Sequence, residues 1–428
     1  MSYFSMGAVT ALALTTMVAV AEASPCGTQF GSVSLITPGE PLSLTSVLGE
    51  VRRISPSVRA AGLEARALGA EADQAGRRLN PSLSIELEDF AGNGALSGFN
   101  QTETTFALQQ TFRLGGKRQL SERAARARQA VASAQCAAIL REAELEAAIL
   151  YAELVAAAQL RDLAEDSASL ADTLASTVER RVDAGAAAPP ELARARADAA
   201  ALRASVSTAQ ADVDRLRYSL ALLWGSAEPV FATPQRSPTR PTLAAETETL
   251  SHPALDAADA AISARNAERD LARSAAIPDL TVSAGFRRFE ETGDEAFIAG
   301  VSIPLPLFDR GRDAARAVSI RGQAASLSRV ATEQRLMAQQ RSAIAIRRAA
   351  QTRLDILTSD ALPAAEEAYG AAVRGYQIGR FDLTTTLNAR AVLLETRLAV
   401  IDADLALQSA DLRLRALISA APFDGDIR

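Results

Sequence analysis

Four short segments of the chain alternate between apolar and polar residues, two in each half. Residues 83–88, for example, place three aliphatic side chains on one face and Glu86 and Glu88 on the other. Because successive side chains of a strand point to opposite faces, the pattern predicts strands with one apolar and one polar face. Glycine-rich loops connect them as two hairpins. The predicted strands cover about residues 82–90, 104–113, 279–288 and 296–305.

Strands of this length with one apolar face are typical of outer-membrane barrels, and a soluble sheet shows the same alternation. Four strands are too few to close a barrel, which needs about eight. Lipid does not tolerate an open sheet edge, so a membrane location predicts that several chains share one barrel.

Between the strand pairs the pattern changes to that of long helices. Residues 117–182 contain neither proline nor glycine, and 312–362 contain only Gly322. Apolar residues from Leu192 to Leu220 recur every three or four positions, a 3.5-residue period that predicts supercoiling against a neighbour. The last helix carries two such rows of apolar residues, which we call seams, and the pattern therefore predicts two neighbouring helices. The predicted helices cover about 45–79, 115–182, 190–224, 253–276, 312–377 and 382–418.

The two halves of the chain repeat one another. Pro56 and Pro81 of the first half match Pro253 and Pro278 of the second at a constant offset. Each half therefore predicts the same order of helix, two strands and two long helices. The predicted first repeat, proline-rich linker and second repeat cover residues 24–224, 225–249 and 250–420.

The N-terminus resembles an export signal. An uncharged apolar run, 6–20, is followed by small residues at Ala21 and Ala23, which predicts a signal peptide over 1–23. Residues 1–5 lack the usual Lys or Arg, so a buried N-terminal helix is the alternative. Cys26 lies where a lipoprotein cysteine would lie, but Pro25 before it is not a small residue. In an oxidising compartment Cys26 and Cys136 could pair, and the sequence does not show whether they meet.

Composition favours long helices and excludes several functions. Hydrophobic residues make up 48% of the chain but aromatic residues only 4%, as expected for Ala-, Leu- and Val-rich helices. The net charge of −6 provides no basic surface for nucleic acid. The chain has a single histidine and two cysteines, which are too few ligands for a zinc cluster. The segment 114–118 lacks the glycine and Ser/Thr of a phosphate loop. We therefore predict no enzyme activity, no cofactor and no metal site.

Taken together, these segments resemble the TolC-like outer-membrane efflux proteins. Residues 80–90 and 112–118 are most similar to the cobalt–zinc–cadmium resistance branch, and 376–381 with 387–390 resemble the family's second hairpin tip. The resemblance implies an α+β membrane protein, a homotrimer with a shared barrel of about twelve strands and a long periplasmic α-helical barrel. It also implies a passive conduit in the outer membrane for heavy-metal cations.

The partners implied by the resemblance are a periplasmic adaptor protein, an inner-membrane proton-driven pump and outer-membrane lipid. Two alternatives remain open from the sequence. One is a drug-efflux or type I secretion channel of the same fold. The other is a soluble coiled-coil scaffold, which explains the heptads but not the strands.

The resemblance also assigns roles to the two hairpin tips, where the alternative is that these residues are only helix caps and turns. The expected adaptor contacts are Val182, Asp183, Gly185, Tyr376, Gly379, Arg380 and Asp382. Some relatives close the periplasmic entrance with two aspartates. The matching positions here are Thr385 and Asn388, with Glu191 and Arg194 in the first repeat. We therefore expect Glu191 to supply the entrance charge, and the lumen to be lined by Glu86 and Glu88.

Overall fold

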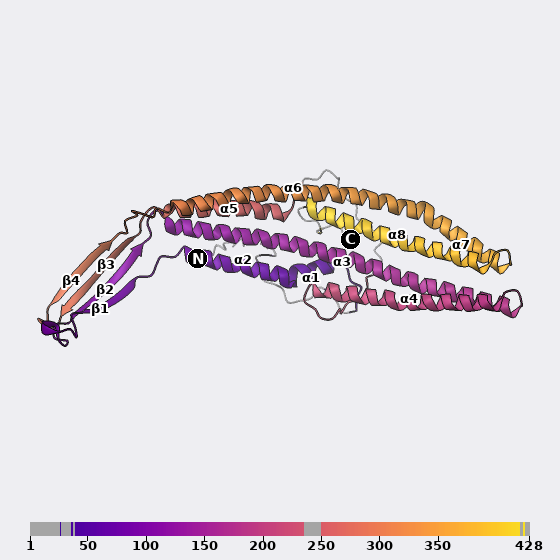
Figure 1. Ribbon diagram of the computed structural model, residues 1–428, viewed down its shortest axis with the longest axis horizontal. Coiled ribbons are helices and arrows are strands. Elements are labelled where there is room, and N and C mark those ends of the chain that lie inside the picture. Colours follow the sequence, from indigo (N-terminus) through magenta and orange to yellow (C-terminus); the bar gives the residue numbers. More distant parts are fainter. Residues whose placement is uncertain (1–25, 27–35, 37–38, 235–249, 420–422, 424–428) are drawn as a thin grey trace, which may run out of the picture.

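The structure is a computed structural model that describes residues 26, 36, 39–234, 250–419 and 423. The described part is elongated, with a small sheet at one end and long helices running to the other (Figure 1). The predicted signal peptide and most of the predicted linker lie outside the described residues.

The sheet consists of four antiparallel strands in the order β1-β2-β3-β4. Strands β2 and β3 come from different repeats and pair along their length, so the two hairpins form one sheet. The register aligns Ile85, Phe106, Phe286 and Phe297 in one row across it. The strands are β1 (Ser82–Glu88), β2 (Glu103–Phe112), β3 (Leu280–Phe289) and β4 (Glu295–Ser302), with a short 3-10 turn (Gly94–Leu96) between β1 and β2.

Two of the predicted strands end earlier than expected. β1 stops at Glu88 because Asp89 adopts a left-handed backbone conformation, with φ of 57°. β4 stops at Ser302 rather than at about 305. Pro304 has no N–H to donate to the ladder, which accounts for the earlier end.

Among its described residues the first repeat contains four α-helices, and the predicted helix 45–79 is wrong in one respect. It consists of two helices, because Pro56 starts a new one and Ser55 before it has an extended ψ of 124°. The bounds are α1 (Leu44–Ile54), α2 (Pro56–Ala75), α3 (Lys117–Asp183) and α4 (Pro189–Leu222).

In the second repeat the predicted helix 312–377 is helical over its whole length, but it is not one uniform α-helix. A π-helical turn, Leu357–Ala361, separates two α-helices. Pro363, at the start of the following helix, cannot donate an intrahelical hydrogen bond, and a wider turn before it accommodates that loss. The helices are α5 (Pro253–Ser274), α6 (Arg312–Ile356), α7 (Leu362–Gln377) and α8 (Leu383–Ile418).

Helix α3 is the central helix of the fold. It is 67 residues long, about 100 Å at the rise of an α-helix, and contacts α1, α2, α4, α5 and α8. Its buried positions are mostly alanines, which let neighbouring helices approach closely. The main apolar core lies where α1, α3 and α4 meet, and it includes Leu154, Val213 and Leu220. Phe231, from the segment predicted as a linker, is only 1% exposed and belongs to this core.

The seams predicted from the heptads have different surroundings. On α4, Ala195, Val213 and Leu216 are buried against the rest of the chain, as the 3.5-residue period predicts. On α8 one seam is buried, with Leu393 only 2% exposed. The other seam is buried at Leu387, in the tip, and open further along the helix, with Leu398 44% exposed. None of the described helices is both long and apolar enough to cross a membrane.

His252 caps helix α5 and makes the stability of this region depend on pH. Its Nδ1 accepts a hydrogen bond from the N–H of Ala254 at 3.1 Å, which requires an unprotonated ring. Burial lowers the pKa of His252, and the nearby positive charges of Arg141 and Arg335 lower it further. The proton therefore binds the unfolded chain more tightly than the folded one. Stability is fully present above the unfolded pKa near 6.5 and is lost as the pH falls from there towards the lower folded pKa.

We expect acidification from pH 7.5 to 5.5 to reduce the free energy of unfolding by about 1 kcal/mol, the usual contribution of an N-cap. Urea unfolding of the detergent-solubilised protein at both pH values measures this. His252→Asn keeps a capping side chain that does not titrate, so it should weaken the pH dependence without loss at pH 7.5. An equal pH dependence in the variant would assign the effect to other groups.

The strand faces and the hairpin tips as candidate functional sites

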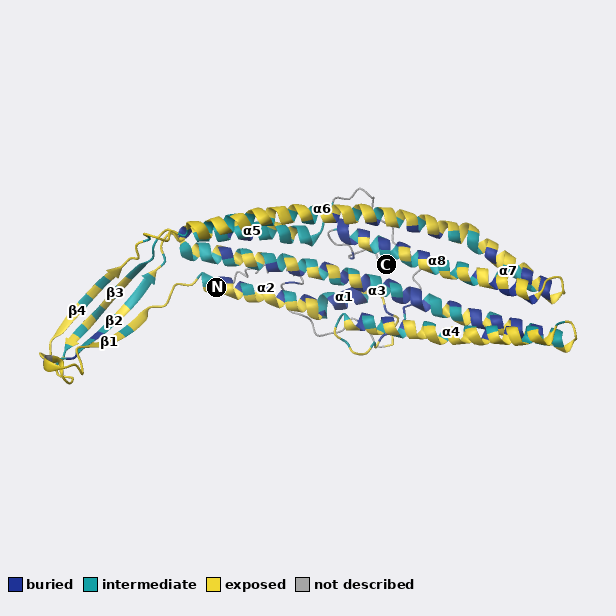
Figure 2. Ribbon diagram, in the orientation of Figure 1, coloured by how far each residue is buried: buried dark blue, intermediate teal, exposed yellow. Residues whose placement is uncertain are grey.

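One face of the sheet is apolar and open. Phe297 is 96% exposed, Val301 69% and Leu83 67%. Phe106 and Phe286 stack across the strands of this face with ring centroids 5.1 Å apart. All four strands carry mostly exposed and half-buried residues (Figure 2). An apolar patch of this extent marks a surface that meets lipid or another protein.

The opposite face is polar, and Arg287 lies at the centre of a network that the sequence did not reveal. Its guanidinium donates to Glu88 at 2.7 Å, to Glu103 at 2.5 Å and to the hydroxyl of Thr105 at 2.9 Å. Glu86 lies on the same face, in the same cross-strand row as Thr105 and Arg287. The structure therefore pairs the predicted lumenal charge of Glu88 with a cation. Arg287 is the one sequence feature that bears on this pairing, because it alternates in phase with the polar residues of β3 and so lies on their face.

At the first hairpin tip, between α3 and α4, the chain turns at Gly185. Its φ is +71°, and a Cβ added there would have no atom within 4 Å, so glycine is required for the backbone conformation and the residue faces open space. Asp183 is exposed, whereas Val182 is half-buried and packs against the apolar core of the tip. Pro189 begins α4, and Glu191 lies in its first turn, where the helix dipole favours a carboxylate.

The second tip, between α7 and α8, is built in the same way. Gly379 has a φ of +75°, and Arg380 after it is exposed. Asp382 caps α8 by accepting a hydrogen bond from the N–H of Thr385 at 2.7 Å. Hydrogen bonding to Thr385, first through its side chain and then through its backbone, lowers the pKa of Asp382. The ring of Phe381 packs directly against Gly375, where a Cβ would lie 2.1 Å from it. Asn388 is exposed one turn further along α8.

Within one chain the two tips are joined around Tyr376. Its hydroxyl donates to the Glu191 carboxylate at 3.3 Å. Arg181 donates to the backbone oxygen of Tyr376 and lies over its ring, 4.7 Å from the centroid. Burial and the neighbouring Glu191 charge raise the pKa of Tyr376, so it remains a donor at neutral pH. These contacts link helices that are far apart in the sequence.

Two further polar contacts continue this link towards the middle of the helices. Arg194 donates to the hydroxyl of Thr384 at 3.1 Å. Arg390, only 4% exposed, pairs with Asp198 of α4. The structure thus brings the predicted entrance residues Glu191 and Arg194 into contacts with the second hairpin. Tyr376 is 2% exposed, so in this chain it positions the tips and presents little surface to a partner.

Tyr376→Phe removes the hydroxyl donor and retains the ring. We expect the two tips to separate more readily, because a hydrogen bond as long as 3.3 Å to a charged group contributes about 1.5 kcal/mol, the lower end of the usual range. For a channel of the kind that the sequence resembles, single-channel recording in planar bilayers should show a larger mean conductance. Tyr369→Phe, on the same helix, is the control. Glu191→Gln keeps an acceptor for the Tyr376 hydroxyl but removes the negative charge of residue 191. Comparing the conductance of the two variants separates the effect of the hydrogen bond from that of the Glu191 charge. Unchanged conductance in Tyr376→Phe would contradict a linking role.

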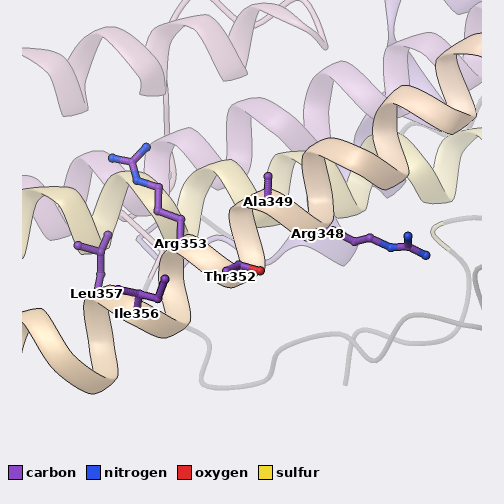
Figure 3. A pocket seen from close by; sticks show the side chains of 6 residues that line it. All are labelled: Arg348, Ala349, Thr352, Arg353, Ile356 and Leu357. Carbon is purple, nitrogen blue, oxygen red and sulfur yellow. The ribbon is translucent and has the colours of Figure 1, made fainter.

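The helical part also has a shallow cleft of about 590 Å³ on α6, immediately before the π-helical turn. It is lined by Arg348, Ala349, Thr352, Arg353, Ile356 and Leu357. The two arginine side chains point in different directions (Figure 3), so no polar groups converge on one ligand. Among the described residues, no group of three or more His, Cys, Asp or Glu side chains could hold a metal ion.

Comparison with known proteins decides between the interpretations of this fold. The model of a family described as "Outer membrane efflux protein" matches residues 47–226 and 246–420, which include both repeats. The chain belongs to this family. It is therefore an outer-membrane efflux channel protein, and the prediction from its strands, heptads and repeats is confirmed. The alternative of a soluble coiled-coil scaffold is excluded by the same match.

Two relatives from Cupriavidus metallidurans resemble the chain over most of their length. The cobalt-zinc-cadmium resistance protein CzcC is 29% identical over 389 residues, covering 89% of this chain and 90% of that protein. The nickel and cobalt resistance protein CnrC is 32% identical over 307 residues, covering 68% of this chain and 70% of that protein.

Solved structures show that the family fold is present. CusC aligns with a TM-score of 0.73 at 18% identity, covering 90% of this chain and 97% of that chain. VceC of Vibrio cholerae aligns with a TM-score of 0.71 at 23% identity, covering 87% and 94%. The chain thus has the protomer fold of the TolC-like channels, an α+β fold of two tandem repeats.

Proposed function

We propose that the chain is the outer-membrane channel of a tripartite pump that exports heavy-metal cations. Three copies would form one barrel from their sheets and one periplasmic tunnel from their helices. The observation that carries this proposal is the open apolar sheet: β1 pairs only with β2, and β4 only with β3, among the described strands. In lipid these two edges must be paired, and further copies of the chain provide the matching edges.

The helices support the same assembly. The open part of the α8 seam, around Leu398, needs a neighbour that the described residues of this chain do not supply. A copy of the chain placed beside it would bury the seam and continue the ring of helices. The channel performs no chemistry in this proposal, since the pump and the adaptor provide the energy and the selection of substrate.

Heavy-metal cations are the substrate class that the relatives favour. CzcC and CnrC are named for resistance to cobalt, zinc, cadmium and nickel. Carboxylates on the polar face of the sheet, Glu86, Glu88 and Glu103, give the lumen a net negative charge even with Arg287 among them. Such a lining attracts cations and repels anions.

The growth of a deletion strain tests this function. Cells lacking the gene are compared with wild type on Zn, Cd, Co, Ni, Cu and Ag salts, and on common drugs and detergents. We expect sensitivity confined to some of the metals, and its reversal by a plasmid copy. Sensitivity to drugs alone would assign the channel to general efflux and would reject the metal proposal.

The exposed residues of the tips are the proposed adaptor surface. They are Asp183, Gly185, Gly379, Arg380 and Asp382. Their turns lie at the end of the molecule opposite the sheet (Figure 1), where a periplasmic partner has access. Val182 and Tyr376 contribute indirectly by packing the tips together.

Gly185→Val tests the adaptor surface. Both the positive φ and the added side chain disturb the tip, so we expect crosslinking to the adaptor to fall about tenfold, equivalent to about 1.4 kcal/mol. Gly39→Val is the matched control, because Gly39 also has a positive φ, +81°, and open space around it but lies outside the tips. Equal crosslinking by both variants at equal expression would reject a role of this tip in adaptor binding.

A further inference from the structure

The structure joins Cys26 to Cys136 by a disulfide, across 110 positions of sequence. Cys136 lies in α3, is fully buried, and its sulfur is 3.9 Å from the backbone oxygen of Val58 in α2. Cys26 is 7% exposed. Neither sulfur therefore lies where a membrane enzyme or a lipid could reach it in the folded chain.

The position of this bond along α3 adds a second argument. Cys136 lies 19 residues after Lys117, where α3 begins beside the sheet. At the rise of an α-helix this is about 28 Å from the sheet end of the helix. Cys26 is held at the same level, because its Cα is 5.9 Å from that of Cys136. An acyl chain on Cys26 would thus start well below the membrane that the strands enter.

The next described positions of the segment are also anchored. Ile36 is buried in the core that contains Leu154 of α3, and the N–H groups of Gly39 and Leu42 bond to backbone oxygens of Val230 and Ala232. Cys26 is attached to α3 at Cys136, and Ile36 packs in the core of Leu154, further along α3. The attachment points therefore move away from the sheet as the chain proceeds. The disulfide is the first of these attachments.

We propose that Cys26 is a cross-linking residue and not a lipidation residue, and that its disulfide with Cys136 fixes the start of the exported chain to α3. In lipoproteins the cysteine sulfur carries the diacylglycerol as a thioether, so the same sulfur cannot also form a disulfide. The two outcomes exclude one another. The inference rests on export of the chain and not on its substrate.

Formation of the bond needs an oxidant of the exported compartment. The two thiols lose two protons and two electrons and form one S–S bond. A dithiol oxidase in its disulfide form accepts them by thiol–disulfide exchange, and its two sulfurs leave as thiols. The bond should therefore be absent from cells that lack such an oxidase.

Mass spectrometry of the full-length protein tests the proposal directly. The chain is purified from outer membranes, free thiols are blocked with N-ethylmaleimide, and the protein is digested with trypsin without reduction. Trypsin cleaves after Arg52, Arg128 and Arg141, so Cys136 is released in peptide 129–141 and Cys26 in the peptide that ends at Arg52. We expect these two peptides to be joined and to separate on reduction, with no lipid mass on Cys26.

Either of two results would overturn the proposal: a diacylglycerol thioether on Cys26, or an N-ethylmaleimide adduct on Cys136 in most of the protein. Cys26→Ser and Cys136→Ser provide a second measurement. If the bond is the anchor, both variants and the double variant lower the thermal unfolding midpoint by the same amount, and none changes the incorporation of labelled palmitate. Metal resistance in cells whose protein lacks the bond would leave the proposed function intact.

Discussion

Ile85→Arg is expected to abolish assembly of the channel in the outer membrane. Ile85 lies in the middle of β1, in the apolar row with Phe106, Phe286 and Phe297. An arginine on the lipid face near the middle of the bilayer costs about 2–4 kcal/mol. The proposed trimer carries this cost in each of its chains. Summed over the trimer, the penalty is comparable to the margin by which most folded proteins are stable.

The matched control is Ser84→Arg, one position earlier on the same strand. Ser84 lies on the polar face with Glu86, so its arginine would enter the lumen. Outer-membrane fractions are compared by native gel electrophoresis for a heat-modifiable trimer, and by growth on the metal that the deletion strain does not tolerate. We expect trimer and growth with Ser84→Arg and neither with Ile85→Arg. Assembly of both variants would show that the apolar face does not meet lipid.

The strands were predictable because alternation is a local property. A strand with one face in lipid needs an apolar residue at every second position, and 83–88 and 280–287 show this without reference to partners. The long helices were predictable for a similar reason. The apolar pattern continues through the break at Pro56, so periodicity alone does not predict it. The repeat itself held the signal, since Pro253 at the matching position also begins a helix.

The contacts of the candidate sites were less accessible, because their partners are distant in sequence. Tyr376 and Glu191 are 185 positions apart, and Arg287 and Glu88 are 199 apart. The alternation places Arg287 on the polar face of its strand, but it does not indicate that two carboxylates from other strands will meet it. The disulfide shows the same limitation, since two cysteines define a possible pair but not their proximity. Glycine was the exception, because the turns at Gly185 and Gly379 require a left-handed backbone that the residue itself reveals.

Loss of the Arg141 side chain should destabilise the junction of the two repeats strongly. Arg141 of α3 is 7% exposed and donates to the backbone oxygens of Ala416, at 3.0 Å, and Ser419, at 2.9 Å. These oxygens lie at the C-terminal end of α8, where carbonyl groups lack intrahelical donors and the helix dipole favours a cation. Arg141 therefore satisfies the end of the last helix and attaches the second repeat to the first.

Arg141→Met keeps most of the volume but leaves these buried oxygens without their charged donor. Hydrogen bonds to charged groups contribute about 1.5–3 kcal/mol each, so we expect a loss of about 3–5 kcal/mol in the free energy of unfolding. Arg215→Met is the control. Arg215 is 63% exposed in its pair with Asp212, and such surface pairs contribute less than about 1 kcal/mol. Urea unfolding in detergent measures the free energy of unfolding of both variants. A loss below about 1 kcal/mol for Arg141→Met would mean that Arg141 contributes little to the junction and that the other contacts between the repeats hold it.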